Sequence, residues 1–162
     1  MALPFRSFVA LLSLAVMACA PGPARSADNQ VAAEAPPAAA TVPLEIRTAK
    51  GILHYKVEVA TTPQEQARGL MYRTSLPDKG GMIFPMKPAR FASFWMKNTY
   101  IPLDLIFIRP DGTISSIAAS AVPEDITPLE SSEPVIAVLE IIGGGALANG
   151  IAPGDKVSWK TR

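Results

Sequence analysis

Apolar residues recur at every second position in several stretches of the chain, and this period constrains its fold most strongly. In one stretch, Leu53, Tyr55 and Val57 alternate with His54 and Lys56. Such alternation is typical of a β-strand with one buried face. The sequence predicts at least six strands, the others lying at residues 91–96, 103–108, 114–119, 135–142 and 157–161.

Only one helix has clear boundary signals. Residues 62–65, Thr-Pro-Gln-Glu, form a capping box with Pro at the first helical position, where its missing N–H costs nothing. Ala67, Leu70 and Met71 then follow on one face at helical spacing, and a second short turn is expected over residues 146–149. Many strands with one short N-terminally capped helix predict a mainly β fold, an antiparallel β-sandwich or barrel.

The chain divides into three parts. Residues 44–162 carry the strand patterns and have the size of one domain. Residues 21–43 are rich in Ala and Pro and lack the branched and aromatic residues that offset the entropy of ordering, so they are expected to form a disordered linker. Residues 1–20 combine Arg6 with an apolar run that is too short to span ~30 Å of hydrocarbon but fits a secretory signal peptide.

The end of this signal segment allows two cleavage sites. Residues 16–19, Val-Met-Ala-Cys, resemble the bacterial lipobox, in which Cys19 would become the acylated first residue. The alternative is cleavage after Ala20, which satisfies the A-x-A rule. Cys19 is the only cysteine, and an unpaired thiol is unusual outside the cytoplasm. The protein is therefore expected to be exported, either free in the periplasm or anchored to the membrane by a lipid at Cys19.

Composition excludes several classes of function. Lys and Arg total 15 against 14 Asp and Glu, so the chain lacks the positive charge that nucleic-acid binding requires. A single Cys and a single His exclude an intramolecular disulfide, a Cys-cluster metal site and a multi-histidine centre. The sequence predicts no cofactor and no nucleic-acid partner, and it indicates membrane association only through the lipid anchor.

Five polar residues are the candidate ligand-binding site. They stand at the ends of predicted apolar strands or next to the predicted helix, where charged groups from distant segments would meet: Arg68, Lys97, Asn98, Asp104 and Glu140. Gathered in one pocket, they could hold a small polar ligand. The structural alternative is a network of ion pairs that satisfies charges buried at the strand ends.

Three functions other than ligand binding stay open. The favoured function is a non-catalytic module of the cell envelope that binds a small polar ligand or assembles with an envelope protein. A structural scaffold without a ligand is the first alternative. The second is a hydrolase in which Asp104 and Glu140 act as general acid and base, although no catalytic residue is assigned.

The third alternative is a Cu(I) carrier. Thioethers are soft ligands that suit Cu(I), and the methionines of the predicted domain cluster within one short part of the sequence: Met71, Met82, Met86 and Met96. The structural interpretation is that these flexible side chains fill irregular gaps in the core.

Several motifs together resemble a known family. They are R-G-L-M-Y-R at 68–73, G-M-I-F at 81–84, F-W-M-K-N-T at 94–99, P-L-D at 102–104, V-L-E at 138–140, and G-D at 154–155. The chain from residue 44 to 159 is similar in this order to the family called domain of unknown function 192. The resemblance implies a mostly β fold found in exported bacterial and archaeal proteins, and it implies no activity.

Overall fold

The structure, a computed structural model, describes residues 40–160. The predicted signal peptide, Cys19 and linker residues 21–39 lie outside this part. The first strand begins at Thr41, so residues 41–43 belong to the sheet and not to the predicted linker. The elements in chain order are β1 (Thr41–Thr48), β2 (Gly51–Val59), α1 (Pro63–Arg68), β3 (Gly80–Arg90), β4 (Ser93–Phe94), β5 (Leu103–Ile108), β6 (Ile114–Ala121), β7 (Leu129–Glu130), β8 (Val135–Ile142), α2 (Gly145–Asn149) and β9 (Lys156–Trp159).

Seven strands form one mixed sheet in the order β6-β5-β8-β3-β2-β1-β9, and β4 pairs with β7 in a separate ribbon. All neighbours in the large sheet are antiparallel except β2 and β3, which α1 connects. The two outer edges of the sheet approach each other at an isolated bridge between Thr113, just before β6, and Lys156 of β9. The predicted mainly β fold is confirmed, and the folded sheet resembles a sandwich and is not a closed barrel.

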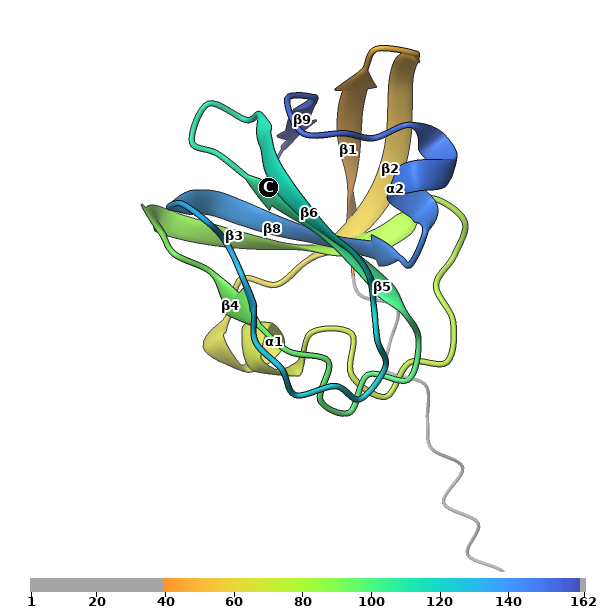
Figure 1. Ribbon diagram of the computed structural model, residues 1–162, viewed down its shortest axis with the longest axis vertical. Coiled ribbons are helices and arrows are strands. Elements are labelled where there is room, and N and C mark those ends of the chain that lie inside the picture. Colours follow the sequence, from red (N-terminus) through yellow and green to blue (C-terminus); the bar gives the residue numbers. More distant parts are fainter. Residues whose placement is uncertain (1–39, 161–162) are drawn as a thin grey trace, which may run out of the picture. The chain divides into compact units, whose positions relative to one another are not determined.

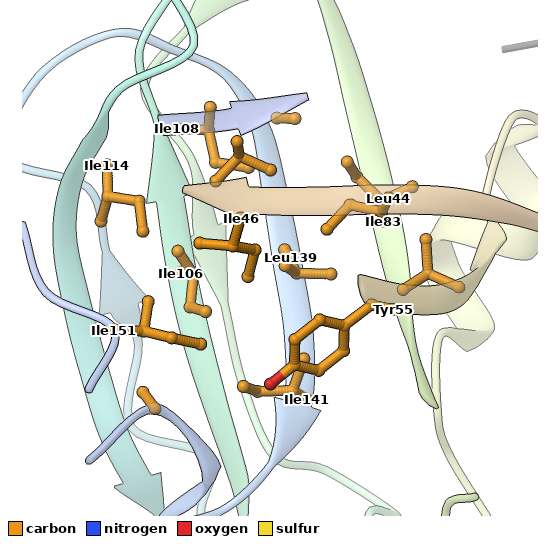
Figure 2. Packing of buried hydrophobic residues seen from close by; sticks show 14 of the residues in the cluster. Leu44, Ile46, Tyr55, Ile83, Ile106, Ile108, Ile114, Leu139, Ile141 and Ile151 are labelled. Atoms are coloured by element: carbon orange, nitrogen blue, oxygen red, sulfur yellow. The ribbon is translucent and has the colours of Figure 1, made fainter. Parts of the chain in front are cut away.

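The first core lies on the concave side of this sheet. The sheet bends so that β1 and β2 face β5 and β8 (Figure 1), and their inward residues interlock. Ile46 of β1, Ile106 of β5 and Leu139 of β8 are fully buried there (Figure 2). Each such side chain stabilises the fold by about 1.5–3 kcal/mol relative to leaving it exposed. We call this cluster the inner core.

A second cluster, the outer core, covers the opposite face of the central strands. Phe84 of β3, Leu105 of β5 and Val138 of β8 point to this side, where Leu70 and Met96 from the connecting segments pack on them. Strand β5 is buried on both faces along its whole length. This double burial explains why residues 103–108 form a nearly continuous apolar run instead of alternating.

Helix α1 begins as the sequence predicts. The Thr62 Oγ1 accepts a hydrogen bond from the Glu65 N–H at 3.1 Å, and the Glu65 carboxylate accepts one from the Thr62 N–H at 2.8 Å. The helix ends at Arg68, so Leu70 packs into the outer core from the segment that follows it.

Neither helix in the described part of the chain is long and apolar enough to cross a membrane.

The prediction of a central strand at residues 91–96 is wrong. Only Ser93 and Phe94 are in a strand there, the small ribbon strand β4, and the central strand is β3, immediately before it. The sequence of β3 contains two glycines and two prolines, residues that usually argue against a strand interior. Gly81 is needed because a Cβ at this position would lie 2.3 Å from the carbonyl oxygen of Glu140 on β8.

Candidate functional site

A pocket of about 570 Å³ opens on the side of the outer core. Its walls come from β3 of the sheet, from the end of α1 and from the segment around β4. Helix α1 and β4 lie on the same side of the sheet (Figure 1). The volume is in the range of pockets that bind small molecules. Its lining residues are mostly apolar: Gln66, Ala67, Arg68, Gly69, Leu70, Met71, Phe84, Met86, Arg90, Phe91, Ala92, Ser93, Phe94, Trp95, Thr99, Pro128 and Glu140.

Local hydrogen bonds hold both walls in place. On one side, the Gln66 side-chain amide donates to the carbonyl oxygens of Ala60 at 3.2 Å and Pro85 at 3.1 Å, which ties α1 to the sheet. On the other side, the Ala92 N–H donates to the Ser131 hydroxyl and the Ser131 N–H donates to the Ala92 carbonyl, both at 2.9 Å. The pocket therefore lies between two anchored segments.

Glu140 forms the floor of the pocket. Its cross-strand neighbours are Met82 on β3 and Leu105 on β5, both apolar, and the residue is only 5% exposed. Within residues 40–160 its carboxyl group takes part in none of the hydrogen bonds or ion pairs of the structure. Burial raises the pKa of Glu140 to about 8 because the charged form loses its hydration. The group is therefore mostly protonated at neutral pH.

Gly69 keeps the space beside this carboxyl open. The residue has a φ of +49°, which favours glycine. A Cβ built there would lie 3.3 Å from the Phe84 ring and 3.9 Å from the Glu140 Oε2. The backbone that follows α1 thus approaches the floor closely without a side chain to cover it.

The rim of the pocket is positively charged and aromatic. Arg68 and Arg90 both line it, and both are exposed. The ion pairs found in the described part of the chain use other acidic residues, namely Glu45, Glu58 and Glu133, so neither guanidinium there has a carboxylate partner. Trp95 is 53% exposed at the same rim. The arrangement combines two cations, an aromatic surface and a buried acid.

The structure brings together two of the five predicted site residues. Arg68 and Glu140 line the pocket. Lys97 is exposed and lies beside it, with its Nζ 5.4 Å from the centre of the Trp95 ring. The Asn98 side-chain amide donates to the Tyr72 hydroxyl at 3.0 Å, and the Asn98 carbonyl accepts from the Tyr72 N–H at 2.8 Å. Asn98 thus joins two connecting segments and does not line the pocket.

Asp104 lies on the other face of the sheet, contrary to the expectation of one shared site. It pairs with Ile141 across β5 and β8, whereas Glu140 pairs with Leu105. Directly paired residues point to the same face and successive residues to opposite faces. Asp104 is therefore on the side of the inner core and Glu140 on the side of the outer core. The hypothesis of a hydrolase that uses these two carboxylates as a pair is wrong in its geometry.

The Asp104 carboxylate has a structural role. It is fully buried, and its oxygens accept three backbone hydrogen bonds, from Ser120 at 2.7 Å, Gly144 at 2.9 Å and Ala146 at 2.7 Å. These contacts connect β6 to the start of α2. A carboxylate that accepts three N–H groups satisfies donors that would otherwise be buried without partners.

The four methionines lie on the side of the outer core. Met82, Met86 and Met96 are buried in it, as the packing interpretation predicts, whereas Met71 is half-buried in the pocket wall. Cu(I) binding by these thioethers stays a prediction. Residues 40–160 contain no group of three or more His, Cys, Asp or Glu side chains that could hold a metal ion.

Sequence reasoning missed Arg90 and the apolar walls of the pocket. Met82, Phe84 and Met86 alternate in β3 and are all buried in the outer core, on the face that carries Glu140. Recognising residues 80–90 as a strand would have placed Phe84 and Met86 near Glu140, and Arg90 at the end of the same strand. The glycines and prolines of β3, which are typical of turns, obscured this strand pattern in the sequence.

A comparison with family models identifies the family and leaves the activity open. A model of the family DUF192, described as "Uncharacterized ACR", matches residues 44–159. A search of curated proteins gave no match. A crystal structure of a protein of unknown function from Novosphingobium aromaticivorans DSM 12444 is 51% identical, with a TM-score of 0.72 over 74% of this chain and 85% of that one.

A second crystal structure is similarly close. It is a Sinorhizobium meliloti 1021 protein provisionally described as a transcription regulator, 39% identical, with a TM-score of 0.72 over 75% of this chain and 95% of that one. Both structures thus share the fold and much of the sequence.

Proposed function

This chain belongs to the DUF192 family, and because no activity comes with that membership, we propose from its pocket that the protein binds a small organic ligand without converting it. The carrying observation is Glu140, a carboxyl group only 5% exposed at the floor of a largely apolar pocket, which has no hydrogen-bond or ion-pair partner among residues 40–160. No side-chain oxygen or nitrogen in the described part of the chain is both fully enclosed and unpaired, so the Glu140 carboxyl group is reached from the pocket. A bound ligand there would supply the hydrogen-bond partner that a polar group in such an apolar setting normally has.

The lining chemistry favours binding over catalysis. A carboxylate-pair hydrolase needs two acids within ~5–10 Å across one cleft, and Glu140 is the only acid among the lining residues. The apolar walls and a few polar groups are instead typical of a site that orients a ligand. The pocket therefore favours the binding module over the scaffold without a ligand.

Blocking the mouth of the pocket tests this function. Ala67 is exposed on α1 and lines the pocket, so Ala67→Trp should obstruct entry without disturbing either core. The probe is N-phenyl-1-naphthylamine, an uncharged aromatic molecule that fluoresces when it leaves water. We expect saturable binding to the wild type, and binding about tenfold weaker or worse in the variant, a loss of about 1.4 kcal/mol.

Gln64→Trp is the matched control. Gln64 is exposed on the same helix but does not line the pocket, so this variant adds the same indole and should bind like the wild type. Equal weakening by both substitutions, or the absence of saturable binding to the wild type, would contradict the proposed function.

We also propose that the ligand is bound in the cell envelope. The proposal rests on the signal-like residues 1–20 and on Cys19 within the lipobox-like sequence. In cells fed an alkyne-tagged palmitate, we expect the wild-type protein to incorporate the label and Cys19→Ser to incorporate none. Because Cys19 is the only cysteine, labelling that persists in the variant, or a wild type that is exported but unlabelled, argues against the lipid anchor.

A further inference from the structure

We infer that the pocket selects small organic anions, with Arg68 and Arg90 receiving the anionic group at the rim and Glu140 lying at the floor. This inference rests on the proposed function of the same pocket and names its ligand class: an apolar, preferably aromatic body with a carboxylate or sulfonate group.

The charge of the rim is the first argument. Among the residues that line the pocket, only Arg68, Arg90 and Glu140 carry titratable or permanently charged groups. The two guanidiniums come from different elements, the end of α1 and the end of β3, yet they border one opening. Each is free of a carboxylate partner within the described residues, so its donors are available to an anion. Guanidinium groups suit carboxylate-like anions because they donate in a fork.

The protonation state of Glu140 at the floor of the pocket is the second argument. Arg68 and Arg90 are the charged groups that share the pocket with Glu140, while its neighbours on β3 and β5, Met82 and Leu105, are apolar. Asp104 of β5 points to the opposite face. Burial alone raises the pKa of Glu140, which keeps it uncharged at neutral pH. The lining then carries a net positive charge, and Glu130, whose carboxylate accepts a hydrogen bond from the lining residue Ser93 at 3.4 Å, lies outside it.

The walls supply the third argument, because they fit the body of such a ligand. Phe84 and Met86 form the inner wall, and Trp95 and Phe91 extend it to the rim, where they are 53% and 65% exposed. An aromatic ligand can stack on these rings while its charged group remains at the hydrated rim. A strongly hydrated inorganic anion would leave this apolar surface uncovered.

Two probes that differ by one charged group test the inference. 8-Anilinonaphthalene-1-sulfonate is N-phenyl-1-naphthylamine with a sulfonate added, and both fluoresce on binding. At pH 7 and low salt, we expect the sulfonate to bind more tightly than the uncharged probe. In the double variant Arg68→Gln with Arg90→Gln, affinity for the sulfonate should fall about 5–10-fold, as expected for exposed charge pairs. Affinity for the uncharged probe should change less than about twofold.

The control removes two positive charges elsewhere. Arg47 and Lys50 are exposed near the turn between β1 and β2, outside the pocket lining, so Arg47→Gln with Lys50→Gln should leave both affinities unchanged. Near-ultraviolet circular dichroism of each variant must match the wild type, because the sulfonate probe also binds partly unfolded proteins.

A pH series tests the role of Glu140. Between pH 7 and pH 9 the group ionises, so affinity for the sulfonate should fall several-fold in the wild type and much less in Glu140→Gln. Equal affinity of the wild type for the two probes, an equal effect of the pocket double variant on both, or a flat pH profile would overturn the inference. The uncharged probe would still bind in each of those cases, whereas its failure to bind would overturn the proposed function as well.

Discussion

Asp104→Asn is expected to lower the free energy of unfolding by about 3 kcal/mol or more. The carboxylate is fully buried and accepts three backbone N–H groups. An amide of the same shape replaces one acceptor oxygen with an NH2 group, which then faces an N–H donor. Each buried donor left without a partner costs about 1–3 kcal/mol, and the repulsion between donors adds to this cost.

Urea denaturation measures this loss, and hydrogen exchange locates it. The amides of Ser120, Gly144 and Ala146 are the donors, so their exchange should accelerate more than that of the central strands. Glu124→Gln is the control, because this exposed residue has the same acid-to-amide change and should alter stability by less than about 0.5 kcal/mol. An Asp104→Asn protein as stable as this control would show that the three hydrogen bonds are not needed.

Glu140→Gln is expected to have the opposite effect at alkaline pH and to stabilise the protein. The pKa of Glu140 is raised from 4.5 to about 8 in the folded state. Between these two values the unfolded chain has lost the proton and the folded protein retains it, so the stability contributed by this group falls as pH rises. At about 1.4 kcal/mol for each pKa unit, the loss amounts to about 4–5 kcal/mol by pH 9.

The amide variant cannot lose this proton. Its free energy of unfolding should therefore be within about 1 kcal/mol of the wild type at pH 4 and should exceed it by several kcal/mol at pH 9. Urea titrations of both proteins at pH 4, 7 and 9 give the difference, which removes the contribution of other ionising groups. A difference that is constant over this range would mean that the carboxyl group is hydrated and ionises normally in the folded protein.

The two carboxylates show where sequence analysis reaches its limit. Asp104 and Glu140 each interrupt an apolar strand, so the sequence marks both as charged residues in an unusual setting. Which face each occupies depends on the register of β5 against β8, where Leu105 and not Asp104 lies opposite Glu140. A shift of one residue would place Asp104 opposite Glu140, with both carboxylates on the same face. No local pattern in either segment sets this register, so the sequence could not tell which carboxyl group lies at the pocket floor and which is held by backbone N–H groups.

Features with a local cause were predicted correctly. The capping box of α1 depends on residues three positions apart, and the alternation of β2 depends on residues two positions apart. Strand β3 was missed for a non-local reason. Its Gly81 fits against the backbone of β8, and such a contact is visible only when both strands are in place. Because β3 was not predicted, Arg90 at its end was not included in the predicted site.

Strands β3, β5 and β8 separate the two cores, and none of the buried side chains in the described part of the chain belongs to both. The pocket is built almost entirely from segments that pack on the outer-core side of these strands, whereas Asp104 and the isoleucines of the inner core lie on the other side. Substitutions in those segments can therefore change the shape of the pocket without altering how the sheet assembles. Relatives with the same architecture can differ in the walls of this pocket while they keep the same sheet.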